Sequence, residues 1–221
     1  MQYLSRVFVF RFSLAAVLCS LTFFFTSDAR AIGRSYFNMR ETFSGDITPF
    51  PKWTGMQDRF GKQRELPDEE CAGVRFHSCV AAEWRGMFVQ WREKKLLEQL
   101  KSINDFANAH PYLLDQLNWG MEDYWETPYE FLVVNGDCED YAIAKYYTLR
   151  ALGVPASQLR VIIVQDFNLG GIIHAILGVY DDDKLYILDN QIAQVMRALS
   201  IYHYKPIYGI NEEGWWAYYP K

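Results

Sequence analysis

One cysteine of this sequence stands among three acids, in the stretch NGDCEDYAIAKYYTLRALG at residues 135–153. Cysteine attacks as the thiolate, and carboxylates next to it disfavour that form. Asp137 is a typical helix N-cap, which puts Cys138 in a first helical turn, and Asp140 follows at the spacing of a capping box. The unpaired N–H groups and the positive dipole end of such a turn favour a thiolate and can hold an oxyanion.

A histidine and an aspartate on two predicted strands could complete this chemistry. GGIIHAILGVY alternates in polarity, DDDK follows as a turn, and LYILDN reads as the next strand. With residues 181–182 as a two-residue turn, Tyr180 faces Asp183, and His174 falls directly opposite Asp189. A carboxylate in that position fixes the tautomer of the imidazole, which can then take the thiol proton and return it to a leaving amine.

The sequence therefore predicts a Cys-His-Asp triad of Cys138, His174 and Asp189. Each member has an ordinary alternative: a small core cysteine, a hydrogen-bonded core histidine and an aspartate of a turn. The combination favours the triad over the three separate alternatives. His203, in IYHYKP, is the rival histidine, but it lacks an acidic neighbour at the matching place.

The acids around Cys138 predict a metal site. Their charge opposes the thiolate unless a cation cancels it, and a hard divalent cation bound by carboxylate oxygens would do so. Calcium suits oxygen ligands outside the cytoplasm, so we expect Asp137 and Glu139 to bind Ca²⁺, with Asp140 as a further ligand. In the alternative, Asp137 only caps the helix, and the other acids are solvated or paired with Arg or Lys.

Residues 1–31 have the order of a secretory signal peptide: basic residues, an apolar run at 12–25, then Ala-Arg-Ala at 29–31. The apolar run is shorter than the roughly 20 residues that span a bilayer, although an uncleaved anchor is the alternative. The mature chain, 32–221, would be one exported domain that is not integral to the membrane. It keeps 19 Lys and Arg against 26 Asp and Glu, a net charge of −7. With no basic block, nucleic acid is disfavoured as a partner.

Export also bears on the remaining cysteines. CAGVRFHSC predicts a short loop closed by a Cys71–Cys79 disulfide. Two unpaired thiols, or a metal pair with His77, are the alternatives. Cys138 is then the odd cysteine of the mature chain.

The elements that position these residues read as helices followed by antiparallel strands, an α+β fold. The expected elements are an extended segment over 32–77, one bent helix or two helices over 80–109, a short helix at 112–117, a loop over 125–136, a helix from Cys138 that Gly153 and Pro155 stop, and strands at 159–165, 170–180, 185–190, 201–209 and 215–219.

Several of these blocks resemble the bacterial transglutaminase-like cysteine proteinases. TPYEFL, GDCEDYAIAKYYTLRALGVP, HAILGVY and LDN carry the resemblance, with GDCEDYA the most specific, and PFPKW and the signal peptide extend it. It implies a papain/transglutaminase-like fold with the nucleophile at a helix N-terminus. It also implies Cys138, His174 and Asp189 as the triad, and calcium held by Asp137 and Glu139.

The resemblance further implies a periplasmic endopeptidase that cuts a large surface adhesin near its N-terminus, at a small-residue, Ala-Ala type site. That cut would free the adhesin and disperse a biofilm, and an inner-membrane receptor responsive to cyclic di-GMP would sequester the protease. In related folds a tryptophan or glutamine often completes the oxyanion hole. Trp125 is the candidate beside the backbone N–H of Cys138, with loop packing as the alternative.

Two other functions remain open from the residues alone. An acyl transferase that joins glutamine to an amine could use the same triad. A non-enzymatic module that binds adhesin or receptor could carry the triad as a relic.

Overall fold

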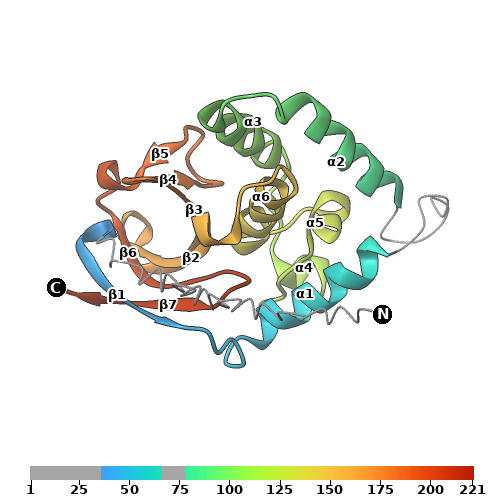
Figure 1. Cartoon of the computed structure of the whole chain (residues 1–221). Coiled ribbons are helices and arrows are strands. Elements are labelled where there is room, and N and C mark those ends of the chain that lie inside the picture. The colour runs from blue at the N-terminus through green and yellow to red at the C-terminus, as the bar shows by residue number, and fades with distance from the viewer. Residues whose placement is uncertain (1–35, 66–77) are drawn as a thin grey trace, which may run out of the picture. The chain divides into compact units, whose positions relative to one another are not determined.

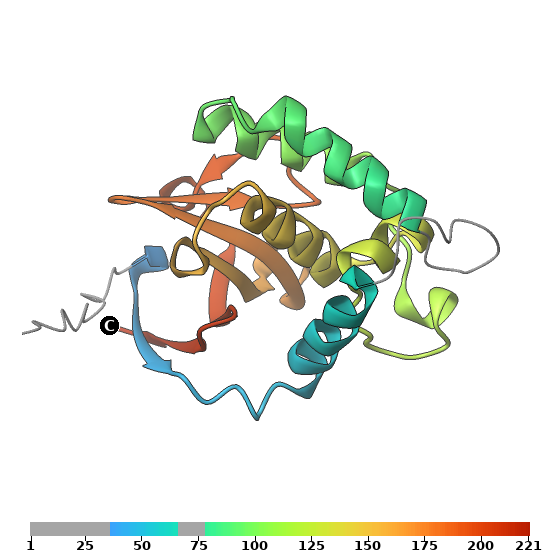
Figure 2. The ribbon, with the colours of Figure 1, turned by 45° about the vertical axis from the view of Figure 1, so that its right-hand side comes forward.

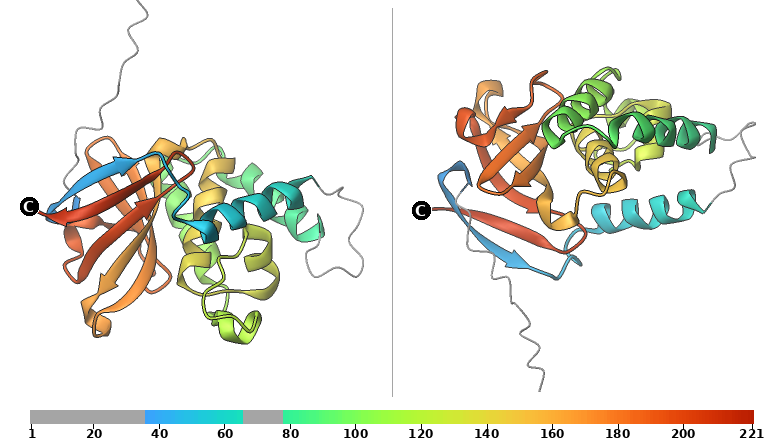
Figure 3. Two further views of the ribbon diagram at one scale, coloured as in Figure 1. Left: turned by 90° about the horizontal axis from the view of Figure 1, so that it is seen from below. Right: turned by 45° about the horizontal axis from the view of Figure 1, so that its top comes forward.

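A seven-stranded antiparallel sheet forms one layer of the domain, in a computed structural model that describes residues 36–65 and 78–221. The strand order is β1-β7-β6-β2-β3-β4-β5, and β1 and β7 lie side by side at one edge (Figure 3). The strands are β1 (Met39–Ser44), β2 (Leu159–Asp166), β3 (Ile172–Asp181), β4 (Lys184–Leu188), β5 (Met196–Arg197), β6 (Tyr204–Ile210) and β7 (Trp215–Pro220).

Helices form the second layer, on one side of the sheet (Figures 1 and 2). The α-helices of the described ranges are α1 (Pro51–Arg64), α2 (Ser78–Trp91), α3 (Leu96–Asn108), α4 (Asp115–Asn118), α5 (Pro128–Val134) and α6 (Cys138–Ala151). Short 3₁₀ segments are η1 (Tyr36–Asn38), η2 (Ala156–Gln158), η3 (Phe167–Leu169) and η4 (Ala198–Ser200). The predicted α+β class is confirmed. Among the described helices, none has the length and apolar character needed to cross a membrane.

Helix α6 lies between the sheet and the other helices, and it packs against β2 and β3. Every residue from Glu139 to Leu149 is buried, which is the pattern of a core helix rather than an amphipathic surface helix. Its C-terminus comes just before Gly153, whose φ of 96° stops the helix as predicted. Because both faces of α6 are packed, the position of Cys138 is fixed relative to the sheet.

The opposite face of the sheet carries a second apolar cluster, against which η1 and η4 pack. At its edge, the buried guanidinium of Arg160 makes two hydrogen bonds to Glu41 of β1, at 2.7 and 3.3 Å. The same group lies 3.7 Å from the ring centroid of Trp216 and 4.5 Å from that of Tyr180. A buried cation therefore joins the first strand to the middle of the sheet.

The predicted extended segment over 32–77 was wrong in part, because it contains helix α1. The buried residues of α1 are Trp53, Met56 and Phe60, at spacings of three and four residues that lie on one helix face. Two glycines and several polar residues hide this pattern in the sequence. Packing of the three large side chains against core aromatic residues outweighs the weak intrinsic propensity.

The predicted loop over 125–136 was also wrong, because it contains helix α5. Thr127 caps this helix, with its Oγ1 accepting from the Glu130 N–H at 3.1 Å and Glu130 Oε2 accepting from the Thr127 N–H at 2.8 Å. Pro128 occupies the first helical position, where a missing N–H costs nothing. The TPYE pattern is a capping box, so the signal was present in the sequence.

The stretch over 80–109 forms two helices, α2 and α3, one of the two arrangements predicted. The hairpin of β3 and β4, however, differs from the predicted register by two residues. Asp181 pairs with Lys184, so the turn is 182–183, where Asp182 adopts a left-handed φ of 49°. A shift of two leaves His174 and Asp189 on the same face but makes them diagonal rather than opposite neighbours.

Two sequence predictions fall outside the described residues. The signal peptide over 1–31 is one of them. The Cys71–Cys79 disulfide is the other, since the structure describes neither Cys71 nor the side chain of Cys79.

We predict that Glu41→Ala lowers the free energy of unfolding by about 3 kcal/mol, because it leaves the Arg160 guanidinium buried without its carboxylate. Urea denaturation followed by fluorescence would measure this loss. The neighbouring Arg40 is exposed, so Arg40→Ala is the matched control, with an expected change within about 0.5 kcal/mol. The pair Glu41→Met and Arg160→Met together should recover most of the loss. An unaltered midpoint in Glu41→Ala would contradict this account of β1.

Candidate active site

The first turn of α6 presents Cys138 as predicted. Asp137 is the N-cap, and its backbone N–H donates to Asp140 Oδ2 at 3.0 Å. Gly136 allows the close approach of this carboxylate, because a Cβ atom there would lie 2.7 Å from Cβ and 2.9 Å from Cγ of Asp140. The capping role predicted for Asp137 and Asp140 is confirmed.

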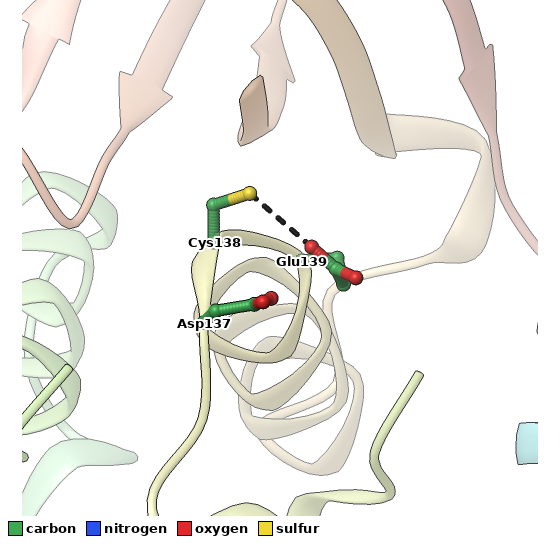
Figure 4. Close-up of side chains that lie close together, drawn as sticks. All are labelled: Asp137, Cys138 and Glu139. Atoms are coloured by element: carbon green, nitrogen blue, oxygen red, sulfur yellow. Dashed lines mark hydrogen bonds between the residues drawn. The ribbon is translucent and has the colours of Figure 1, made fainter. Parts of the chain in front are cut away.

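The Cys138 thiol donates to Glu139 Oε2 at 3.2 Å (Figure 4). The backbone N–H of Ala175, the residue that follows His174 on β3, acts on the same sulfur and favours its thiolate. Burial raises the pKa of this thiol, the charges of Glu139 and Asp137 raise it further, and the Ala175 N–H only partly opposes them. Without a compensating cation, Cys138 is therefore a protonated thiol.

His174 and Asp189 meet as predicted, although through a diagonal contact. Nε2 of His174 lies 2.9 Å from Asp189 Oδ1, and both residues are buried. Burial alone would raise the pKa of Asp189, but its hydrogen bonds from His174, Tyr204 and Gln191 outweigh burial and lower that pKa. An ionised carboxylate only accepts, so Nε2 carries the proton and Nδ1 is left for another partner.

Nδ1 of His174 lies 3.4 Å from Gln191 Nε2. Within the described residues, the thiol of Cys138 is bonded to Glu139 and not to His174. The structure thus places His174 and Asp189 together where β3 starts and β4 ends, and it places Cys138 at the start of α6, the helix that packs against β3. It holds His174 and Asp189 in hydrogen-bond contact, while the Cys138 thiol donates its proton to Glu139.

Six acids gather around the N-terminus of α6, twice the number predicted. Three groups have carboxylate or thiol atoms within 4.8 Å of one another: Asp137 with Cys138 and Glu139, Asp115 with Glu126 and Asp140, and Asp115 with Asp123 and Glu139. The sequence analysis missed Asp115, Asp123 and Glu126 because they precede α5 in a segment read as a short helix and a loop. Four acids within the twelve residues 115–126, these three and Glu122, were the available signal.

Most of this cluster is buried and under-bonded. Asp115 Oδ1, Glu126 Oε2 and Asp137 Oδ1 are buried, and the described residues give them no hydrogen-bond partner. Burial raises the pKa of Asp115 to about 6 and that of Glu126 to about 8. Burial also raises the pKa of Glu139 well above its ordinary value. Carboxylate oxygens without donors are what a hard divalent cation binds, so the residues present fit calcium.

Asp140 differs from the other acids of the cluster. Its Oδ1 accepts from the Glu126 N–H at 2.7 Å, and its Oδ2 accepts from the Asp137 N–H. Both oxygens therefore hold the backbone on either side of the site. Its predicted role as a metal ligand stays a prediction, next to this evident structural role.

Trp125 packs in the core, edge-on to Trp53 at 6.3 Å between ring centroids. Its backbone oxygen accepts from Arg59 Nη2 at 2.5 Å. The structure thus gives Trp125 the packing role that was the alternative to the oxyanion hole. The backbone N–H of Cys138 lies at the N-terminus of α6, and its role as a donor to an oxyanion stays a prediction.

The core behind the triad also contains a lysine that the sequence analysis did not single out. Lys145 of α6 is buried, and its Nζ has no hydrogen-bond partner among the described residues. Burial lowers the pKa of Lys145 to about 7, while the charge of Asp189 acts in the opposite direction. The charge of Asp189 therefore interacts with the Lys145 side chain as well as with the His174 imidazole.

Comparison with known proteins settles the family. The model of the bacterial transglutaminase-like cysteine proteinases (BTLCP) matches residues 71–219. The chain belongs to this family. A bacterial transglutaminase-like cysteine proteinase is a thiol protease, and Cys138 is the free cysteine of the described residues.

Solved structures of LapG from Legionella pneumophila are similar to this proteinase. The calcium-bound structure is 31% identical, with a TM-score of 0.58, over 74% of this chain and 86% of that one. A second structure, at 30% identity and the same TM-score, covers 73% and 87%. An EGTA-treated one, also at 30% and 0.58, covers 73% and 84%. The resemblance to bacterial transglutaminase-like cysteine proteinases that the sequence blocks indicated is confirmed. The comparison with curated proteins gave no match.

We predict that, without calcium, this proteinase loses stability as the pH rises from about 5 to 8. The folded-state pKa values of Glu126 and Asp115 lie above their ordinary values of 4.5 and 3.8. Between the ordinary and the raised values, the folded state binds more protons than the unfolded state, so the free energy of unfolding falls with pH. Urea midpoints measured in EGTA across this range would show the slope.

Glu126→Gln keeps the shape of the side chain and removes its charge, so it should flatten that slope. Glu122 is exposed nearby, and Glu122→Gln should leave the slope as in the wild type. A stability that rises steadily over this pH range would contradict the charge assignment.

Proposed function

We propose that the chain is a calcium-dependent cysteine endopeptidase with Cys138 as nucleophile, His174 as base and acid, and Asp189 as the residue that orients His174. The observation that carries the proposal is the buried His174–Asp189 hydrogen bond of 2.9 Å. The backbone N–H of Ala175, the residue next to His174, lowers the pKa of the Cys138 thiol, which supports placing this pair near the nucleophile. Membership of a cysteine protease family supports the same assignment.

The proposed reaction follows from the hydrogen bonds of the three residues. Nδ1 of His174, the ring nitrogen that Asp189 does not hold, takes the proton from Cys138. Sγ attacks the scissile carbonyl carbon, and the backbone N–H of Cys138 donates to the developing oxyanion. The imidazolium then protonates the leaving amine, so the amide bond breaks and a thioester remains. Water, deprotonated by the same imidazole, hydrolyses the thioester and restores the thiol.

Calcium would be held by Asp137 and Glu139, together with the oxygens of Asp115 and Asp123 that lie near Glu139. When bound, it supplies positive charge that offsets the acids around the nucleophile. A Glu139 carboxylate committed to a ligand role no longer competes with His174 for the Cys138 proton. The similarity to a LapG structure described as calcium-bound supports this proposal.

We further propose that the substrate is the N-terminal region of a large surface adhesin, so that cleavage releases the adhesin and disperses a biofilm. The proteinase would act in the periplasm after removal of residues 1–31. An inner-membrane receptor that responds to cyclic di-GMP would sequester it. These three statements are supported by the sequence blocks that resemble adhesin-releasing proteases and by the similarity to LapG.

We predict that Cys138→Ala lowers cleavage of adhesin N-terminal fragments at least 1,000-fold and leaves the melting temperature within a few degrees, the scale of losing a nucleophile. His174→Ala should be similarly inactive. His203, the rival histidine, provides the matched control, and His203→Ala should retain activity within a few fold. Gel and mass analysis of the products would measure cleavage, and fragment masses that sum to the substrate mass plus one water identify hydrolysis rather than acyl transfer. Full cleavage by Cys138→Ala would reject the nucleophile.

We predict that EGTA stops cleavage and that added calcium restores it. Asp137→Asn should raise the calcium concentration for half-maximal activity about tenfold or more, because one ligand charge is lost. Asp183 lies in the β3–β4 turn, away from the acid cluster, so Asp183→Asn is the matched control. Equal calcium titration curves for the two variants would remove Asp137 from the ligand set. Activity that persists in EGTA, with calcium verified absent, would end the metal proposal.

A further inference from the structure

The surroundings of Asp189 are completed by Tyr204, the first residue of β6. Its hydroxyl donates to Asp189 Oδ2 at 2.5 Å. The other carboxylate oxygen, Oδ1, accepts from His174 Nε2 and from the Gln191 N–H, both at 2.9 Å. We propose that Tyr204 is a positioning residue of the protease reaction: its hydroxyl sets the orientation of the Asp189 carboxylate and, through it, of the His174 imidazole. This inference rests on the proposed triad.

A β-bulge brings Tyr204 to the correct face of the sheet. Ile163 of β2 pairs with Tyr208, but Val164 pairs with Pro206, so Ile207 is one extra residue on β6. Side chains alternate between faces, and one extra residue reverses which of them point to each face. Tyr208 accordingly packs with the cluster under the helices, while Tyr204 joins the cluster on the opposite face. Without the bulge, Tyr204 would face away from Asp189.

Pro206 suits this irregular position. It lacks a backbone N–H, and proline is tolerated in sheets chiefly at edges and bulges. Strand β6 pairs with β7 only from Tyr208 onward, so no β7 residue faces Pro206. The sequence therefore contains a local reason for the bulge that re-aims Tyr204.

Other groups around Asp189 do not replace the Tyr204 hydroxyl. Asn108 of α3 donates to the Asp189 backbone oxygen at 2.7 Å, which anchors the chain but leaves the carboxylate torsion free. Lys145 acts on Asp189 through its charge without a hydrogen bond. Asp166 of β2, which pairs with Tyr204, accepts from the Asn168 N–H. Among the described residues, Tyr204 is thus the one hydrogen-bond donor to Oδ2.

Loss of the hydroxyl has two physical consequences. The carboxylate can rotate about its Cβ–Cγ bond, so the Nε2–H tautomer of His174 is no longer fixed. The carboxylate also becomes a stronger acceptor, because a charge-assisted bond no longer shares its negative charge. A more negative Asp189 stabilises the imidazolium, which then persists to higher pH.

Tyr204→Phe keeps the ring and removes only the donor. We expect kcat to fall about tenfold, the scale of one hydrogen bond to a charged group, with KM within twofold. The acidic limb of the kcat/KM pH profile, which reports the protonation of the base, should move to higher pH. The ¹⁵N shifts of the His174 ring in the full-length mature protein should change from one tautomer to a mixture. A purely structural role would lower the melting temperature without moving the limb or the shifts.

Two further variants keep the test decisive. Tyr218 packs in the same apolar cluster, where its hydroxyl accepts from Arg160, so Tyr218→Phe should lower stability and leave the ¹⁵N shifts unchanged. Tyr204→3-fluorotyrosine retains the donor and should retain activity. Wild-type kcat and ¹⁵N shifts in Tyr204→Phe would overturn the proposal, and so would equal losses in the phenylalanine and fluorotyrosine variants. The shifts need no substrate, so failure of wild-type cleavage would count against the proposed reaction and not against Tyr204.

Discussion

Burial of the first turn of α6 is the constraint on which the site depends. The helix is packed on all sides, so its N-terminus, with Cys138 and the acids beside it, is held against β3 and away from bulk water. Desolvation is accordingly the largest influence on the pKa of Cys138 and of Glu139, and it favours their neutral forms. The burial that holds Cys138 in place also suppresses ionisation of its thiol. In the proposed mechanism, positive charge added at that end of the helix offsets this effect.

The buried carboxylate of Asp189 and those around Cys138 differ in the groups that stabilise their charge. Asp189 receives three hydrogen bonds and has Lys145 behind it, and its pKa is lowered. Among the acids around Cys138, Asp123 pairs with Lys52, and three buried oxygens, of Asp115, Glu126 and Asp137, lack donors within the described chain. Hydrogen bonds and the charge of Lys145 therefore stabilise the carboxylate of Asp189, whereas the carboxylates around Cys138 have oxygens available to bind a cation. In the proposed mechanism, Asp189 is thus ionised without a metal, whereas ionisation of Cys138 depends on a bound cation.

The sequence predicted those parts of the site that depend on local chemistry. The helix cap at Asp137, the first-turn cysteine and the Gly153 stop follow from residue types at short spacing, and all are confirmed. The predicted β3–β4 register was wrong because three consecutive aspartates allow two turns one residue apart, which shifts the strand register by two, and contacts of the folded sheet decide between them. Asp115 and Tyr204 escaped prediction because their roles arise from contacts across the fold. Tyr204 in particular depends on a bulge whose only sequence trace is Pro206.

The pairing of β1 with β7 has a consequence for biosynthesis. Met39 lies opposite Pro220, and Arg160 ties Glu41 to the sheet from the middle of the chain. Within the described residues, β1 pairs with β7, so this pairing cannot form until nearly the entire polypeptide has been synthesised. Contacts of such long sequence separation slow folding, so closure of this edge should be a late event. Until then the segment that becomes β1 stays unpaired.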